Sequence, residues 1–208
     1  MRLPNAVHTS RSWRVHELTR DFTLEDVWAL PTPGGRNDFT RLVQDFPRLM
    51  QGLASGDSSS VTSRATRLLF AVRRALGRVF RWDGSGSGVG SRVPTLRDRL
   101  PADLRDAPTG PDLGSFTSVY LLDDEWAVEL ANRTVHGVMH IGWVPDDAGG
   151  YRGEMAVYAK PNGLLGTGYM HAIAPFRRVI VYPAMMRQIE RRWQAGVSGA
   201  VRPAPEDT

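Results

Sequence analysis

The stretch NRTVHGVMHIGWV, Asn132–Val144, decides the fold, because it forms either a helix or a strand of a sheet. It holds two of the chain's five histidines, His136 and His140, four residues apart. On a helix, side chains at this spacing share a face and can bind one metal ion. The segment instead has β-branched residues, glycine and alternating polarity, which predict a strand. In a strand the two histidines lie about 13 Å apart, at roughly 3.3 Å per residue, and cannot chelate one ion.

Three further segments have the same strand character. They are SFTSVYLL (115–122), EWAVELAN (125–132) and YRGEMAVYAKP (151–161). Short polar or glycine-containing turns separate all four segments. Consecutive strands with short connections predict an antiparallel meander.

Alternation along these strands assigns their side chains to two faces. Matching apolar to apolar positions predicts one face that carries Trp126, Val128, Leu130, Val135, Met139, Ile141, Trp143, Met155 and Val157. The other face carries His136, His140, Glu125, Glu129, Glu154, Tyr158 and Lys160. We expect cross-strand pairs of histidine and carboxylate there, on an exterior surface or facing a second copy in a homo-oligomer, rather than a catalytic site.

The first third of the chain is interpreted as mixed structure. Residues 12–18 have the bulky, β-branched character of a short strand. Residues 21–31 are predicted to enter a helix, with Thr23 as its cap and Asp26 three residues later in the capping-box position. Residues 39–53 predict an amphipathic helix interrupted near a proline, Pro47.

Residues 61–82 form the clearest amphipathic pattern in the chain, with six arginines and no acidic residue. The pattern favours a helix packed on the core with a solvated arginine face, and a helix lying on a membrane surface is the alternative. The glycine-serine run that follows lacks the ending of a phosphate-binding loop, so 83–114 is predicted to be an irregular connection.

Residues 162–196 predict a long C-terminal helical region, which Pro175 and Pro183 should start, kink or divide. Its apolar face carries Ile173, Phe176, Val179, Ile180, Met186, Ile189 and Trp193. Residues 198–208 are polar and contain proline, which predicts a disordered tail. The expected organisation is one domain over residues 1–197, because 208 residues that are 41% hydrophobic suit a single core.

Composition excludes several classes of protein. The absence of cysteine excludes disulfides, thiolate zinc sites and cysteine nucleophiles. No apolar run is long enough for a membrane span or a signal peptide, so we expect a cytoplasmic protein. The net charge of +4 is small, and basic residues are interspersed with acidic ones, so we do not expect nucleic-acid binding. No motif predicts a metal ion, a cofactor or a serine hydrolase.

Four segments resemble the bacterial domain-of-unknown-function (DUF) family 2867. They are residues 90–104, 132–144, 153–166 and 169–189, and the similarity extends from His8 to about Trp193. That family looks related to the helix-grip superfamily of Bet v 1, START-like lipid-transfer domains and polyketide cyclases. The resemblance implies an α+β fold in which a curved antiparallel sheet wraps around a long C-terminal helix. It also implies a hydrophobic cavity between the sheet and the helix.

The residues expected to line an apolar ligand come from the apolar sheet face and the C-terminal helix. They are Trp126, Met139, Trp143, Met155, Val157, Tyr169, Phe176 and Ile180. Aromatic and methionine side chains at this spacing also suit a packed core, so a cavity and a solid core both remain open.

Three functions are compatible with this pattern. The first is a non-catalytic carrier or sensor of an apolar small molecule or lipid. The second is an enzyme of the cyclase or dehydratase kind, whose proton-transfer group would have to be His171, Tyr120, Tyr169 or Tyr182. The third is association with a membrane surface or a protein through the two arginine-rich helices. No residue is assigned a catalytic role.

Overall fold

The computed structural model describes residues 1–55 and 88–200, and within these ranges the side chains of residues 51–55, 165, 169, 171–173, 176 and 197–200 lie outside the description. The strands are β1 (Arg2–Leu3), β2 (Thr23–Ala29), β3 (Thr117–Leu121), β4 (Glu125–Ala131), β5 (Val135–Pro145) and β6 (Tyr151–Pro161). The helices are α1 (Asn5–Thr9), α2 (Val15–Leu18), α3 (Phe39–Ser55), α5 (Gly163–Phe176) and α6 (Tyr182–Ala200). Two 3-10 helices, η1 (Leu96–Arg99) and η2 (Ala102–Leu104), and a π-helical turn, η3 (Arg177–Val181), complete the described elements.

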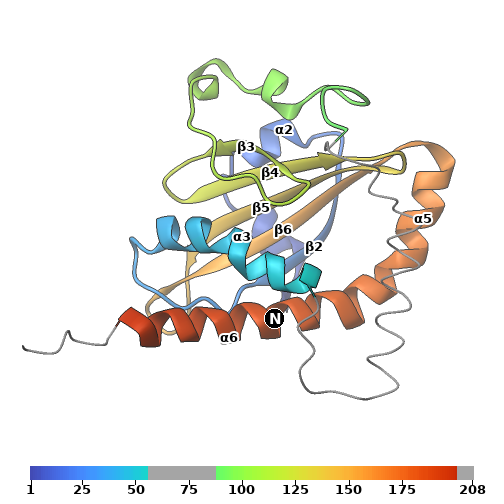
Figure 1. Ribbon diagram of the computed structural model, residues 1–208. Helices are drawn as coiled ribbons and strands as arrows, with labels where there is room; N and C mark the ends of the chain where they lie inside the picture. The colour runs from blue at the N-terminus through green and yellow to red at the C-terminus, as the bar shows by residue number, and fades with distance from the viewer. Residues whose placement is uncertain (56–87, 201–208) are drawn as a thin grey trace, which may run out of the picture.

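The strands form one six-stranded sheet in the order β1-β2-β6-β5-β4-β3, and every neighbouring pair is antiparallel. Strands β3 to β6 form the predicted meander (Figure 1). The segment around the two histidines is strand β5, at the centre of the meander. The α+β class and the C-terminal helical region are therefore confirmed.

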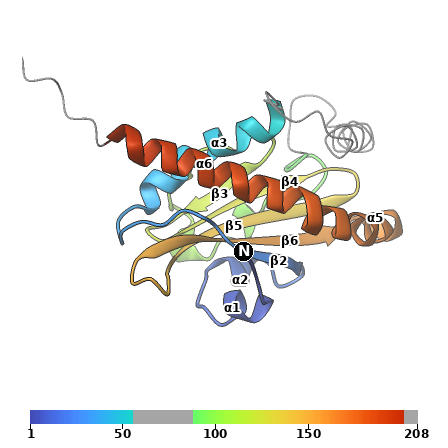
Figure 2. The same cartoon turned by 90° about the horizontal axis from the view of Figure 1, so that it is seen from below.

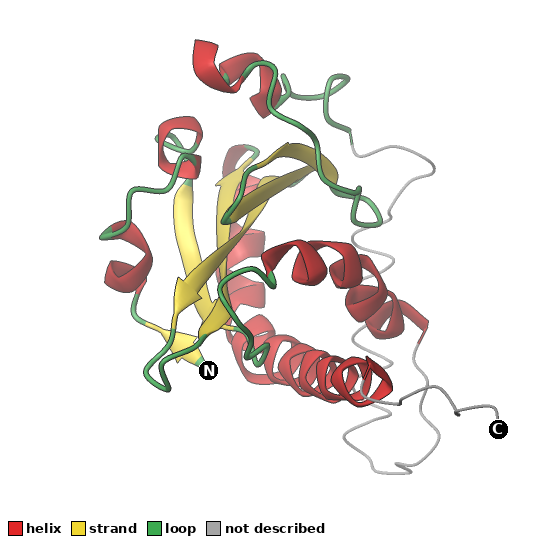
Figure 3. Ribbon diagram, turned by 90° about the vertical axis from the view of Figure 1, so that its left-hand side faces the viewer, coloured by secondary structure: helices red, strands yellow, loops and turns green. Residues whose placement is uncertain are grey.

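Both faces of the sheet are covered. Helices α3 and α6 lie on one face, and α1 and α2 lie on the other (Figures 2 and 3). The segment from η1 to η2 contributes Leu96, Leu100 and Leu104 to the core on the α1 and α2 side. Gly142 in β5 allows a close approach on this side, because a Cβ atom there would lie 2.6 Å from the ring of Trp13. The domain therefore has three layers, with the sheet in the middle.

The core between the sheet and helices α3 and α6 is the larger of two apolar clusters on the two faces. Helix α6 contributes Tyr182, Met185, Met186, Ile189 and Trp193 to it. The predicted apolar face of the sheet therefore packs against the C-terminal helix, as expected. In the described part of the chain, no helix is long and apolar enough to cross a membrane.

Two N-terminal predictions were wrong. Residues 12–18 contain helix α2 rather than a strand, and residues 21–31 contain strand β2 rather than a helix. Thr23 does not cap a helix, because it pairs with Ala159 of β6, and Asp26 pairs with Val157. Tertiary pairing with β6 thus overrides the local capping signal.

Two helical predictions have different outcomes. Pro47 does not interrupt α3, which runs through it from Phe39 to Ser55. Near Pro175 and Pro183 the long C-terminal region is divided into α5 and α6, as expected, and the π-helical turn η3 joins them. The helix expected over 61–82 and the tail beyond residue 200 lie outside the described residues.

Ile189 provides a test of the packing between α6 and the sheet, because its side chain is fully buried. The substitution Ile189→Ala should lower the free energy of unfolding by about 3 kcal/mol through lost burial and a residual cavity. Urea denaturation measures this change. The control Val179→Ala, at a position 72% exposed in η3, should change the stability by less than about 0.5 kcal/mol. Equal effects of the two substitutions would contradict the described packing.

Candidate functional site

Four of the predicted ligand-lining residues lie together in the core between the sheet and helices α3 and α6. Trp126, Met139, Trp143 and Met155 are each at most 6% exposed and belong to one apolar cluster. Both indole N–H groups have partners: that of Trp126 donates to Ser118 Oγ at 2.9 Å and that of Trp143 to the Gly35 carbonyl oxygen at 3.1 Å. These four side chains therefore pack against other core residues of the sheet, α3 and α6.

Val157 lies at the border of this core. It is partly buried and packs against the large cluster, whereas Val135, Ala159 and Met170 form a separate small cluster that joins the sheet to α5. Ile180 is half-buried in η3. The side chains of Tyr169 and Phe176 lie outside the description. The helix-facing side of the sheet is thus packed by two distinct clusters, with Val157 between them.

The opposite face carries the predicted histidine and carboxylate pairs. His136 Nε2 donates to Glu129 Oε2 at 2.8 Å, and His140 Nε2 donates to Glu125 Oε2 at 2.9 Å. The pairing was predicted, but the exterior location was wrong, because all four residues are at most 4% exposed. The N-terminal segment and the η1–η2 segment cover this face.

The covering segments supply partners to the carboxylates. Glu129 Oε1 accepts hydrogen bonds from the Thr95 hydroxyl at 2.5 Å and from the Leu96 backbone N–H at 3.0 Å. Glu125 accepts bonds from the Arg14 backbone N–H at 3.0 Å and from the Tyr120 hydroxyl at 2.8 Å. Each buried carboxylate therefore anchors a segment that is distant in the sequence.

A third pair joins the N-terminal segment to β6. His8 Nδ1 donates to Glu154 Oε1 at 2.7 Å, and both side chains are fully buried. The His8 ring lies 5.1 Å from the His140 ring and 5.2 Å from the His16 ring, measured between centroids. No local pattern predicts the pairing of His8 with Glu154, because the two residues are 146 positions apart.

The pKa values of this cluster follow from its burial and pairing. Burial lowers the pKa of His8 from 6.5 to about 4, although the hydrogen bond that His8 donates to Glu154 acts in the opposite direction. Burial alone would raise the pKa of Glu125 and of Glu154, but bonds to His140 and His8, respectively, outweigh it and lower both values. Burial, together with the charge of Glu125, raises the pKa of Tyr120. At neutral pH Glu125 and Glu154 are thus ionised acceptors and Tyr120 is a protonated donor.

The cluster resembles an acid-base site in its connectivity, since a carboxylate orients each histidine. His8 Nε2 and His140 Nδ1 are buried and have no hydrogen-bond partner in the described part of the chain. Tyr120, a candidate acid for an enzyme, lies in this cluster and not on the helix-facing side. Among residues 1–55 and 88–200, no three His, Asp or Glu side chains are arranged to hold a metal ion. The closed packing supports a role in holding the layers together.

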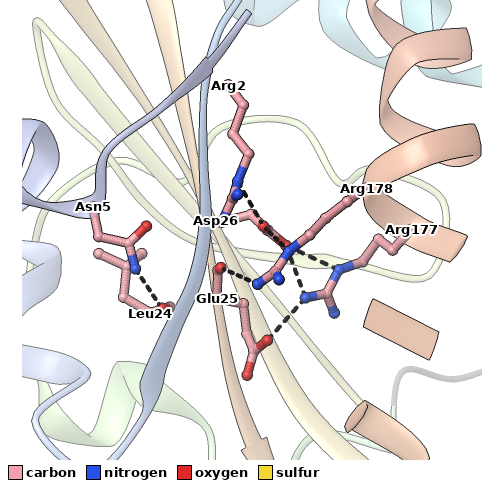
Figure 4. A network of polar contacts seen from close by, with 7 residues as sticks. All are labelled: Arg2, Asn5, Leu24, Glu25, Asp26, Arg177 and Arg178. Atoms are coloured by element: carbon pink, nitrogen blue, oxygen red, sulfur yellow. Dashed lines mark hydrogen bonds and ion pairs between the residues drawn. The ribbon is translucent and has the colours of Figure 1, made fainter. Parts of the chain in front are cut away.

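A second polar network lies where the α5–η3–α6 unit meets strand β2 (Figure 4). Asp26 is fully buried, and its Oδ2 accepts bonds from two nitrogens of Arg177, Nε at 3.1 Å and a terminal nitrogen at 2.8 Å. Its Oδ1 accepts a bond from Arg178 Nε at 2.7 Å and lies 3.4 Å from Arg2 Nε. Arg177 also donates to Glu25 at 2.9 Å. We call these five residues the arginine clasp.

Sequence reasoning missed the arginine clasp. A shift in the strand register between Leu24 and Asp26 places Asp26 opposite Val157, on the side of the sheet that faces the helices. The available signal was Asp26, an acidic residue next to the apolar VWAL run. The local sequence pattern instead predicts that Asp26 is part of a helix capping box. A surface groove of about 710 Å³ borders the arginine clasp and is lined by Arg2, Leu3, Pro4, Asn5, Thr23, Leu24, Glu25 and Arg178.

Comparison with known proteins adds one finding. The model of a family described as "protein of unknown function (DUF2867)" matches residues 18–184. No curated protein and no solved structure matches the chain. The matched range includes all of β2 to β6 and η3, and therefore most of both polar clusters.

The pKa of His8 predicts loss of stability in acid. The unfolded chain binds a proton at His8 below pH 6.5, whereas the folded protein does so only near pH 4. Stability should therefore fall as the pH falls from 6.5 to 4, by about 3 kcal/mol in total from this residue. The variant His8→Gln, which keeps a donor for Glu154, should lose less stability over the same range. Urea titrations at several pH values would contradict the assignment if both proteins responded alike.

The arginine clasp predicts different costs for the loss of two aspartates, one buried and one exposed, that each pair with several basic side chains. Asp26→Asn should lower the free energy of unfolding by about 3 kcal/mol, because it leaves three arginines without their buried counter-charge. Asp21 is the control: it pairs with Arg99 and Lys160 on the surface, where its side chain is 41% exposed. Asp21→Asn should cost less than about 1 kcal/mol. Denaturation that ranks the two variants in the opposite order would contradict the described role of Asp26.

Proposed function

The chain belongs to the DUF2867 family, and we propose that it is a cytoplasmic, non-catalytic carrier of a small apolar molecule or lipid. The proposed ligand lies between the sheet and the α5–η3–α6 unit, over Val157. We further propose that the α+β architecture is of the helix-grip type. The element order supports this, since an antiparallel sheet is followed by a long C-terminal helical unit that crosses it (Figure 1).

The observation that carries the proposal is the division of the helix-facing side at Val157. On one side of this residue the sheet is packed by α3 and α6, and on the other it contacts α5 through Met170. Val157 itself remains only partly buried, although it is an apolar residue on an inner strand. A small apolar surface that the described residues do not fully cover suits an apolar ligand.

The π-helical turn η3 lies beside this position. Asp26 pairs with Val157 across the strands, and the two arginines that bind Asp26, Arg177 and Arg178, belong to η3. π-Helical turns inside helices are frequent at functional sites, because they displace side chains from the regular helical positions. Ile180, also in η3, is half-buried and was one of the predicted ligand-lining residues.

The chemistry next to Val157 supports binding rather than catalysis. The described ionisable side chain that pairs with Val157 across the strands is Asp26, and it is already bound to its own arginine partners. The histidine-glutamate pairs lie on the opposite face of the sheet, under the N-terminal segment. A ligand over Val157 would therefore meet apolar surface with a charged rim formed by the arginine clasp.

The first experiment is native mass spectrometry of the purified protein, followed by titration of the delipidated protein with a fluorescent fatty-acid analogue. Burial of about 300 Å² of apolar ligand surface contributes on the order of 7 kcal/mol, so the titration should cover micromolar concentrations. We expect a bound apolar molecule and saturable binding of the probe.

Two variants locate the site. Val157→Phe fills the proposed position and should weaken probe binding at least tenfold while the protein stays folded. Val179→Phe makes the same change at a position that is 72% exposed and should leave the affinity unchanged. Absence of any saturable binding, or equal binding by wild type and the Val157→Phe variant, would overturn the proposal.

A further inference from the structure

The groove beside the arginine clasp lies at the outer edge of strand β2. Strand β1 pairs only with the second half of β2, through Arg2 opposite Trp28 and Leu3 opposite Val27. The first half of β2, Thr23–Glu25, therefore has no strand beside it on that edge in the described part of the chain. This uncovered half and the departing residues of β1 form two walls of the groove.

Side chains occupy backbone hydrogen-bond acceptors along this edge of β2. The Leu24 carbonyl oxygen accepts a bond from Asn5 Nδ2 at 2.8 Å, and the Glu25 carbonyl oxygen accepts one from an Arg178 nitrogen at 3.2 Å (Figure 4). Two backbone acceptors that could pair with an added strand are thus already used. The groove consequently presents side chains to a ligand, which favours a small molecule over an added peptide strand.

Arg2 and Arg178 enter the groove as held side chains. Each is fixed through its Nε to the same buried oxygen of Asp26, at 3.4 Å and 2.7 Å respectively. Their side chains are nevertheless 48% and 37% exposed. An arginine held in this way loses less conformational freedom when a ligand binds, so more of the interaction energy appears as affinity.

Arg2 and Arg178 supply more positive charge than is needed to neutralise Asp26. Arg177 alone binds Asp26 through two nitrogens. The arginine clasp contains three cations and two carboxylates, so it carries a net charge of +1. Among the described residues, no side chain or carbonyl accepts a bond from the two terminal nitrogens of Arg2. These nitrogens and the excess charge are available to an anion.

We infer that this groove is a binding site for a small molecule that carries a carboxylate or phosphate group. Arg2 and Arg178 take the anionic group, because the guanidinium fork matches the oxygen geometry of both anions. Leu24 and Pro4 provide apolar surface for the rest of the molecule, and the Thr23 hydroxyl and Glu25 favour a hydroxyl or amine on it. The volume of about 710 Å³ lies within the usual range for small-molecule sites. The lining of this groove does not include Val157, so the site is distinct from the one proposed there, although the arginine clasp borders both.

The test is a titration of the full chain, followed by NMR, with inorganic phosphate and, separately, with succinate. Chloride holds the ionic strength constant throughout, so that general screening does not contribute. We expect saturable shifts of the backbone amide signals of Asn5, Thr23 and Leu24. A lower Kd for phosphate identifies a phosphorylated ligand, and a lower Kd for succinate identifies a carboxylate.

Variants separate a specific site from general attraction to a basic protein. Arg2→Gln should weaken binding at least fivefold, and it leaves Arg177 and Arg178 to hold Asp26. Arg105→Gln is the matched control, because Arg105 is an exposed arginine in the segment that covers the other face of the sheet. Its affinity should equal that of wild type. Absence of saturable shifts, or equal loss in the two variants, would overturn the inference, and neither result bears on apolar binding over Val157.

Discussion

The fold depends on the pairing of three glutamates with three histidines inside the protein. Because layers cover both faces of the sheet, Glu125, Glu129 and Glu154 are removed from water and need internal partners. His140, His136 and His8 supply them, each at 2.7 to 2.9 Å. Backbone N–H groups of the covering segments also donate hydrogen bonds to two of these carboxylates, Glu125 and Glu129. The polar face of the sheet thus holds its own cover in place, and a mispaired layer would leave a charge buried and uncompensated.

The two faces of the sheet consequently differ in what they can do. The face beneath the N-terminal segment combines polar pairs with an apolar cluster. Its histidines and glutamates bind one another and the segments that cover them. The face beneath α3 and α6 is mainly apolar, and its buried Asp26 ties the junction of α5 and α6 to strand β2. Adaptable surface remains where this junction crosses the sheet, at Val157 and beside Arg2 and Arg178. The two proposed binding sites lie there for this reason.

The sequence predicted the sheet well because alternation is a local signal. The four strands from β3 to β6, their meander, and the grouping of Trp126, Met139, Trp143 and Met155 on one face all follow from it. Cross-strand pairs of histidine and carboxylate on the other face followed as well, and His140 with Glu125 is one of the pairs that the structure forms. Burial of that pair could not be predicted, since it depends on a cover formed by residues more than one hundred positions away.

The N-terminal errors have a related cause. Residues 23–29 contain a helix-capping pattern that is as strong locally as their strand character, and pairing with β6 decides between the two. Asp26 was therefore assigned to a helix end, whereas a register shift turns it towards Arg177 and Arg178 at the other end of the chain. The candidate sites depend on such contacts between distant segments. Periodicity alone could locate an apolar face but not the arginine clasp.

The most direct test of the division between the two faces is thiol labelling, because the chain has no cysteine of its own. Val157 and Ala156 are neighbours in β6 that point to opposite faces, and Ala156 is fully buried under the N-terminal segment. At neutral pH the thiol in the Val157→Cys variant should react readily with a small reagent and be protected by a bound apolar ligand. The thiol in the Ala156→Cys variant should react only as fast as the protein unfolds. Equal reactivity, or faster reaction at position 156, would contradict the account.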